Sequence, residues 1–181
     1  MEKKKELWRA VKFTLFSISA GLIEMKRKNW KSLLVCLALP LAAGGLGALL
    51  AGGFGESYRA MYKPVLSPPG WLFPVVWTAL YLMMGYASWL VWTASASAPR
   101  KKRALAVYGA QLALNALWPL FFFRLGLYVF AFVWLLLLIA AVLLCRLLFR
   151  YIDKKAGELL LPYLIWLFFA AYLNLGVAIL N

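Results

Sequence analysis

The sequence predicts an all-α integral membrane protein, a bundle of five transmembrane helices preceded by an N-terminal interfacial helix. Three observations support this prediction. Hydrophobic residues make up 65% of the 181 residues, well above the roughly 45–50% of soluble domains. Five apolar runs reach the about 20 residues that a helix needs to cross a bilayer. Lys and Arg cluster in the short segments between these runs, which is typical of membrane topology rather than of a surface that binds nucleic acid.

Residues 1–32 form a basic amphipathic N-terminal extension. Apolar residues such as Leu7, Val11 and Leu15 recur there at helical spacing, but the uncharged stretch 13–23 is too short to span a membrane. A signal peptide is the alternative, because basic residues precede an apolar stretch, yet no small-residue cleavage site follows. We therefore expect an interfacial helix, held by apolar burial and by attraction of Lys to anionic lipid.

The five spans follow in a single domain, residues 33–181. They are expected at about 33–54, 71–92, 104–123, 127–149 and 159–180. The connecting segments are a Pro-rich loop at 55–70, a basic turn that ends at Arg103, a tight turn at 124–126 and a charged linker at 150–158.

Small residues recur every four positions in two of the spans. Gly44, Ala48 and Gly52 do so in the first span, and Ala106 and Ala110 in the third. Such spacing lets helix backbones approach closely. We expect the first set to pack within the bundle and the second to support a homodimer through the third helix.

The distribution of basic residues predicts the orientation. If five spans alternate sides, one side holds nine Lys and Arg before the first span, four before the third and four around the fourth loop. The other side holds only Arg59, Lys63 and Arg124. The positive-inside rule then places the N-terminus in the cytoplasm and the C-terminus outside, with the Pro-rich loop facing outward.

The sequence lacks the residues of ordinary catalytic and metal sites. It has no His, the commonest general base and metal ligand, so a Ser-His-Asp or Cys-His set cannot form. Cys36 and Cys145 lie far apart in apolar spans and are interpreted as small buried hydrophobic residues rather than a disulfide or metal site. No span contains paired carboxylates. We therefore expect no hydrolytic site, no metal site and no obligatory cofactor.

Five motifs occur in order between about residues 33 and 181. They are Tyr58 to Lys63-Pro64; Pro68-Pro69-Gly70-Trp71 with Phe73 and Trp77; Leu80-Tyr81 with Met84-Gly85-Tyr86-Ala87-Ser88; Asn115 with Trp118 and Phe121-Phe122; and Pro162-Tyr163-Leu164-Ile165-Trp166 followed by Phe169-Ala170 and Leu173-Asn174. One such motif would be weak, but five in order on successive spans are specific. In these motifs the chain resembles the TspO/MBR family of membrane proteins.

The resemblance implies a five-helix bundle with a cavity beneath the first loop, which binds porphyrins such as protoporphyrin IX and haem. We therefore expect a tetrapyrrole-binding protein that acts as a porphyrin sensor or in porphyrin transport, with the porphyrin as ligand. One alternative is an enzyme that degrades porphyrin in light, in which the porphyrin carries the chemistry and Trp166 takes part. Another is a small transporter or scaffold for a different apolar ligand. Without His, haem would lack its usual axial ligand.

The resemblance also implies which residues contact the ligand. The family's pocket positions correspond to Tyr58, Pro69, Trp77, Asn115, Trp118, Trp166 and Ala170. Asn174 lies one turn beyond Ala170 and extends the same face. Arg59 and Lys63 lie on the loop that should cover the pocket, and we hypothesise that one of them pairs with a porphyrin propionate; the alternative is that Arg59 is a solvated loop charge.

The residue types themselves leave alternatives open. Trp77 and Tyr81 are four residues apart and share a helix face, and ring stacking contributes about 0.5–1.5 kcal/mol per pair beyond area burial. These rings could bind a flat ligand or merely pack the bundle. Asn115 and Asn174 could bond to each other, to a free backbone group or to a ligand.

Overall fold

A computed structural model describes residues 30–52 and 54–181 of the chain. The chain divides into two units, residues 1–35 and 36–181, and the second contains the core, the loops and the cavity described below. The interfacial helix expected within the N-terminal extension lies outside the described residues.

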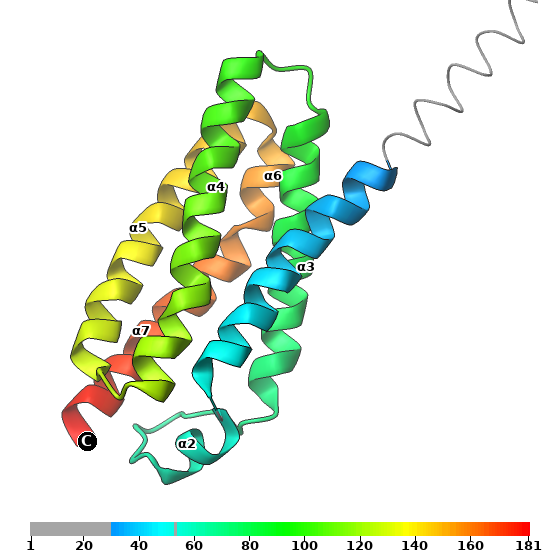
Figure 1. The fold of residues 1–181 in the computed structure, drawn as a ribbon. Coiled ribbons are helices and arrows are strands. Elements are labelled where there is room, and N and C mark those ends of the chain that lie inside the picture. The colour runs from blue at the N-terminus through cyan, green and yellow to red at the C-terminus, as the bar shows by residue number, and fades with distance from the viewer. Residues whose placement is uncertain (1–29, 53) are drawn as a thin grey trace, which may run out of the picture. The chain divides into compact units, whose positions relative to one another are not determined.

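The described residues contain five helices that are long and apolar enough to cross a membrane. This confirms the predicted all-α bundle, which Figure 1 shows as a ribbon. The helices are Trp30–Ala51; α3, Leu72–Thr93; α4, Ala98–Pro119, extended by the π-helical η1, Leu120–Arg124; α5, Tyr128–Ile152; and α6, Lys154–Leu159, followed by α7, Leu161–Leu180. A short helix, α2, Phe54–Ala60, lies in the first loop.

The third span begins earlier than the hydropathy predicts, at Ala98 rather than at 104. Pro99 lies in the first helical turn, where the missing N–H is not needed and the fixed φ favours the helix. The basic residues that follow are therefore helical. Lys101 Nζ turns back to donate to the Trp92 and Ala94 carbonyls, at 3.1 and 3.2 Å, which shows how a long cationic side chain can lie at a helix end.

At its other end the third span changes its hydrogen-bonding register. Pro119 lies inside the helix and has no N–H to donate, which disrupts the regular ladder. The chain continues as η1, where the Leu125 N–H donates to the Leu120 carbonyl at 3.0 Å. Such π-helical segments are rare and frequently occur at functional sites.

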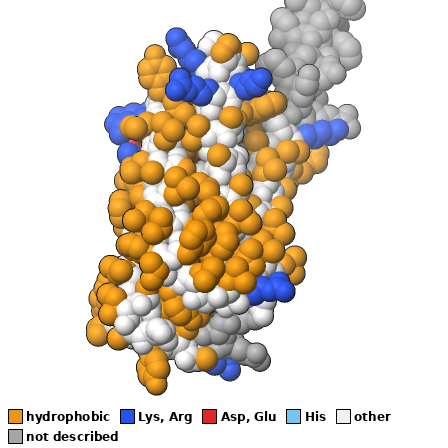
Figure 2. Space-filling model, turned by 60° about the vertical axis from the view of Figure 1, so that its left-hand side comes forward, with side chains coloured by type: hydrophobic (Ala, Val, Ile, Leu, Met, Phe, Trp, Pro, Cys, Tyr) orange, Lys and Arg blue, Asp and Glu red, His pale blue; other side chains and the backbone are white. Residues whose placement is uncertain are grey.

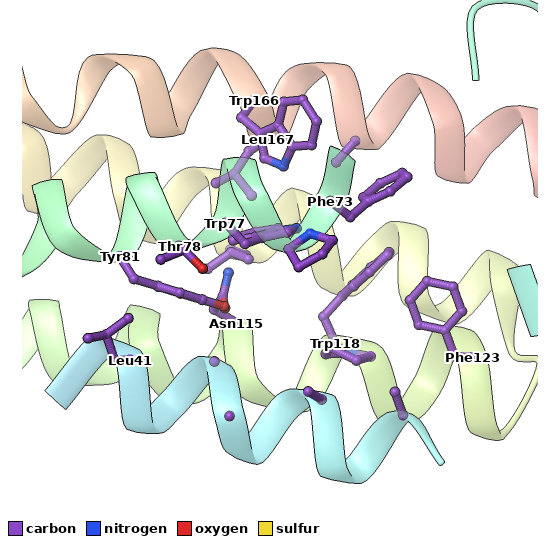
Figure 3. Close-up of a pocket in the computed structure, with 18 of the residues that line it drawn as sticks. Leu41, Phe73, Trp77, Thr78, Tyr81, Asn115, Trp118, Phe123, Trp166 and Leu167 are labelled. Atoms are coloured by element: carbon purple, nitrogen blue, oxygen red, sulfur yellow. The ribbon is translucent and has the colours of Figure 1, made fainter. Parts of the chain in front are cut away.

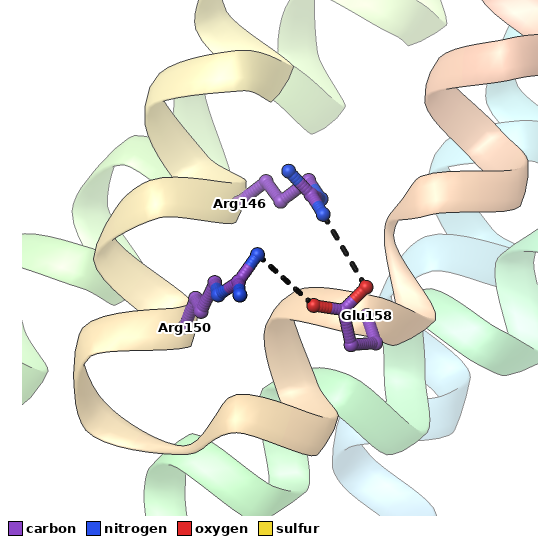
Figure 4. Close-up of polar contacts among 3 residues, drawn as sticks. All are labelled: Arg146, Arg150 and Glu158. Atoms are coloured by element: carbon purple, nitrogen blue, oxygen red, sulfur yellow. Dashed lines mark hydrogen bonds and ion pairs between the residues drawn. The ribbon is translucent and has the colours of Figure 1, made fainter.

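The fifth span is preceded by the short helix α6, which the sequence interpretation placed in a charged linker. The Asp153 side chain accepts the Ala156 N–H at 3.0 Å and so caps this helix. Arg146 and Arg150 of α5 bind the two carboxylate oxygens of Glu158, at 3.3 and 3.2 Å (Figure 4). These ion pairs hold α6 against the end of α5.

The core lies between α3, α4, α5 and α7. Met84, Ala87 and Val91 of α3 are completely buried, and the rings of Tyr108 and Phe149 meet at 5.6 Å across α4 and α5. On the face that Figure 2 shows, apolar side chains cover the middle of the bundle, and Lys and Arg lie mainly toward its ends. This is the surface of a protein that lies in a lipid bilayer.

Candidate functional site

A cavity of about 380 Å³ lies among the helices. Its lining comes from the first helix, α3, α4 with η1, α5 and α7. Six of the lining residues are aromatic, and Figure 3 shows the rings of Phe73, Trp77, Trp118 and Trp166 around the same space. No Lys, Arg, Asp or Glu is among the lining residues. The volume falls within the range of pockets that hold small molecules and cofactors.

One wall of the cavity is built on α3. Trp77 and Tyr81 stack at 5.5 Å with 30° between their planes, as their spacing of four residues on one helix allows. Gly44 of the first helix lies against the Tyr81 ring, and a Cβ at Gly44 would overlap that ring. The glycine therefore sets how closely the first helix approaches α3 at the cavity.

Asn115 is the buried polar side chain of the lining and belongs to a chain of hydrogen bonds. Tyr81 donates to Asn115 Oδ1 at 2.8 Å, and Asn115 Nδ2 donates to the Tyr163 hydroxyl at 3.0 Å. Tyr163 in turn donates to Gln111 Oε1 at 3.2 Å. Because buried polar groups are costly unless satisfied, this chain fixes the position of Tyr81 and of the amide at the cavity surface.

Asn174 has a supporting position behind Trp118. Asn174 Oδ1 accepts a hydrogen bond from Trp118 Nε1 at 3.3 Å, and Asn174 Nδ2 donates to the Tyr128 carbonyl at 2.9 Å. Trp118 lines the cavity and stacks on Phe122 at 4.8 Å, whereas Asn174 is not among the lining residues. The two asparagines thus bond to other residues and not to each other: Asn115 to two tyrosine side chains, and Asn174 to Trp118 and to a backbone carbonyl.

Trp166 and Ala170 of α7 supply the opposite wall. The Trp166 ring meets Phe73 edge-on at 6.0 Å. Its Nε1 atom is buried and has no hydrogen-bond partner among the described residues. A buried N–H without a partner is uncommon in native proteins, and this one belongs to a side chain of the cavity lining.

Tyr58 and Pro69 lie in the first loop and not in the cavity lining. The Tyr58 hydroxyl donates to the Pro68 carbonyl at 2.6 Å, and its ring meets Phe73 edge-on at 5.2 Å. Tyr58 is therefore separated from the cavity by one ring. Burial raises the pKa of Tyr58 above its ordinary value, and a hydrogen bond with Ser67 partly offsets this. The hydroxyl accordingly stays protonated near neutral pH and retains its bond to the loop.

Arg59 and Lys63 also lie outside the cavity lining. Lys63 Nζ donates to the Tyr58 and Met61 carbonyls at 2.9 and 3.2 Å and lies 5.0 Å from the centre of the Tyr58 ring. Its ammonium group thus caps the C-terminal end of α2. Arg59 is exposed. Any pairing of these cations with a ligand would take place at the loop, outside the aromatic part of the cavity.

The loop is fastened to the end of α7. The Tyr172 hydroxyl donates to the Val65 carbonyl at 2.6 Å, and Asn181 exchanges two hydrogen bonds with the Tyr62 backbone, at 3.0 and 2.9 Å. Pro64 lies so close to Gly176 that a Cβ there would be 2.5 Å from Pro64 Cγ. The described part of the loop is thereby held in a defined position next to α7.

Several lining residues were not among the predicted site residues. Of the predicted set, Trp77, Asn115, Trp118, Trp166 and Ala170 line the cavity. The additional ones include Phe73, Tyr81, Gly44 and Gly45. The sequence signal for Tyr81 was the helix face that it shares with Trp77, for which both ligand stacking and bundle packing were left open. The signal for Gly44 was the small-residue spacing of the first span, which was interpreted as packing within the bundle.

The arrangement suits a flat, mostly apolar ligand. Several rings offer faces or edges for stacking, and one amide offers a fixed polar contact. The described residues contain no group of His, Cys, Asp and Glu that could hold a metal ion. The lining provides no carboxylate or imidazole for acid–base chemistry.

Comparisons with known proteins agree with this architecture. The sequence model of the TspO/MBR family matches residues 36–180. The chain is 35% identical over 155 residues to the tryptophan-rich protein TspO of Chlorobaculum tepidum, covering 85% of this chain and 98% of that protein. It is 38% identical over 158 residues to the tryptophan-rich sensory protein of Cereibacter sphaeroides, covering 84% and 93%. It is 38% identical over 138 residues to the translocator protein of Ovis aries, covering 75% and 82%.

Proposed function

The chain belongs to the TspO/MBR family, and from this premise we propose that its cavity binds a tetrapyrrole such as protoporphyrin IX or haem. The protein would then act as a membrane sensor of porphyrins or in their transport and regulation. One relative bears the name tryptophan-rich sensory protein, which accords with a protein that reports a bound ligand.

The observation that carries this proposal is the aromatic lining of the cavity. Trp77 and Tyr81 present a stacked pair on one side, and Trp166 and Phe73 an edge-to-face pair on the other. A porphyrin is a flat π-system that gains from such contacts. Its propionates are charged and need water or cations, so they would point toward the loop rather than toward the apolar depth of the cavity.

A titration in the dark tests the proposal. Purified protein in mild detergent is titrated with protoporphyrin IX while the porphyrin absorbance band is followed. We expect saturable binding of one porphyrin per chain. Trp77→Leu removes one stacking contact of about 0.5–1.5 kcal/mol and should weaken binding by roughly 2- to 13-fold. Trp92→Leu is the matched control, because Trp92 is 56% exposed and outside the lining. Equal effects of the two substitutions would contradict the site, and no saturable binding by wild type would favour a different apolar ligand.

A second candidate function, light-dependent breakdown of the bound porphyrin, is favoured by Trp166. Its indole lines the cavity, and its N–H has no hydrogen-bond partner within the part of the chain that the structure describes. The porphyrin would absorb the light and supply the chemistry, and the indole would lie beside it as a redox partner. Illumination of the complex should then bleach the porphyrin in wild type and much less in Trp166→Phe, while the dark affinity changes little. Equal bleaching rates in both proteins would contradict this second function and would support binding only.

The orientation and the oligomer are further parts of the proposal. We infer a cytoplasmic N-terminus and an outer C-terminus from the excess of Lys and Arg on one side of the spans. We also infer a homodimer through α4, because Ala106, Gly109, Ala110 and Ala113 are exposed along one helix face, and small residues permit close helix contacts in membranes. Gly109→Leu should convert the dimer to monomer in crosslinking, whereas a wild-type protein that is monomeric would contradict the inference.

A further inference from the structure

A groove separate from the aromatic cavity lies on the surface between α3 and α6. Met83 and Tyr86 of α3 line it together with residues of α6, and its volume is about 440 Å³. The α6 residues are Lys154, Lys155, Glu158 and Leu159. None of the six residues belongs to the lining of the aromatic cavity, and the proposed porphyrin binding makes no use of them.

The groove has an apolar floor and a cationic rim. Met83 and Leu159 are half-buried and form the floor, while Lys154 and Lys155 are exposed. Tyr86 is 43% exposed and stacks on Trp89 at 5.6 Å. Tyr and Trp are enriched where a membrane protein meets the lipid headgroups, so these two rings mark the headgroup level at the groove.

The acidic groups near the rim are already engaged. Both carboxylate oxygens of Glu158 bind arginines, Arg146 and Arg150, and Asp153 caps α6 through the Ala156 N–H. No ion pair joins Lys154 or Lys155 to an acidic side chain within the part of the chain that the structure describes. The groove therefore carries two lysines that no acidic side chain among the described residues pairs with, next to its apolar floor.

We propose that this groove binds one anionic phospholipid, with the phosphate on Lys154 and Lys155 and an acyl chain over Met83 and Leu159. The charge favours an anion, and basic pockets between transmembrane helices take up anionic headgroups. The floor favours lipid over an acidic protein segment, because peptide groups laid on Met and Leu side chains would lose hydrogen bonds to water without replacement. A phospholipid carries its phosphate next to its acyl chains, just as the groove has its lysines next to its apolar floor.

Native mass spectrometry of the full chain in mild detergent tests this proposal. The probes are dioleoyl phosphatidylglycerol, which is anionic, and dioleoyl phosphatidylcholine, which is zwitterionic. We expect one tightly held phosphatidylglycerol and no equivalent phosphatidylcholine. Lys154→Gln with Lys155→Gln should weaken phosphatidylglycerol binding about 25-fold, the product of about fivefold for each lysine near a lipid headgroup. Lys102→Gln with Arg103→Gln, which removes two exposed cations outside the groove, should change it less than twofold.

Two further measurements test whether the acyl chain, and not the phosphate alone, is bound in the groove. sn-Glycerol 1-phosphate has the phosphate without acyl chains. It should not displace the lipid at concentrations at which phosphatidylglycerol saturates the protein. Met83→Trp should lower phosphatidylglycerol retention by filling the floor, with the helical circular dichroism unchanged. Equal retention of the two lipids, equal effects of the two double variants, or displacement by glycerol phosphate would each overturn the proposal. Displacement by a hexaglutamate peptide that binds more tightly would assign the groove to an acidic protein partner instead.

Discussion

Filling the cavity from Gly45 is expected to weaken porphyrin binding by roughly 5- to 150-fold without harming the fold. Gly45 lines the cavity, and a Cβ built there meets no atom within 4 Å. A leucine adds four carbon atoms, each close in size to a water molecule with its share of about 30 Å³. The side chain would occupy on the order of 120 Å³, or about a third of the cavity of 380 Å³.

The loss of binding affinity follows from the overlap between the leucine side chain and the ligand. Relieving an overpacked site costs about 1–3 kcal/mol, which corresponds to a roughly 5- to 150-fold loss of affinity. Gly45→Ala adds a single carbon and should have little effect on binding. Either substitution should leave the ligand-free protein as stable as wild type or more so, since glycine within a helix costs about 0.5–1 kcal/mol relative to alanine.

The assay is a dark absorbance titration with protoporphyrin IX, together with thermal unfolding of each ligand-free variant. Ala140→Leu on the exposed face of α5 provides a control for added apolar volume outside the cavity. Affinity that stays at the wild-type value in Gly45→Leu, while the protein remains folded, would refute the assignment of the ligand to this cavity.

Two other substitutions test the surroundings of the site. Asn115→Leu removes the acceptor of the Tyr81 hydroxyl and should lower the free energy of unfolding by about 1–3 kcal/mol, measured as a lower unfolding temperature. Adding Tyr81→Phe should restore most of this stability, and a double variant as unstable as the single one would contradict the reasoning. Gly176→Ala would bring a Cβ to 2.5 Å from Pro64 Cγ and should push the loop away, increasing its amide hydrogen exchange. Gly109→Ala, which meets open space, should leave that exchange unchanged, and identical behaviour of the two glycine variants would argue against the packing of the loop on α7.

The spans were predictable from the sequence because lipid permits only long apolar helices or closed barrels. The fourth span, expected at 127–149, is found at Tyr128–Ile152. The start of the third span was missed because the residues up to Arg103 are charged, and a hydropathy criterion places such residues in a loop. Their long stems allow them to continue the helix at the membrane surface.

The site was predictable only in part. Trp77 and Trp166 line the cavity as the resemblance implied, whereas Tyr58 lies one ring away and Lys63 is engaged with backbone carbonyls. Spacing shows which side chains share a helix face but not which neighbouring helix that face meets. Gly44 allows Tyr81 to lie against the first helix. This contribution depends on the distance between the first helix and α3, and the sequence indicates it only through the recurrence of small residues.

The most direct test of the central claim is the quenching of tryptophan fluorescence by protoporphyrin IX in the dark, compared between wild type and Gly45→Leu. If the porphyrin occupies the aromatic cavity, quenching in wild type saturates at one porphyrin per chain, because Trp77, Trp118 and Trp166 all line that space. Quenching of the filled variant should then need roughly 5- to 150-fold more porphyrin to reach half-saturation. Saturable quenching of equal strength in both proteins would contradict the account, since the porphyrin would have to bind elsewhere.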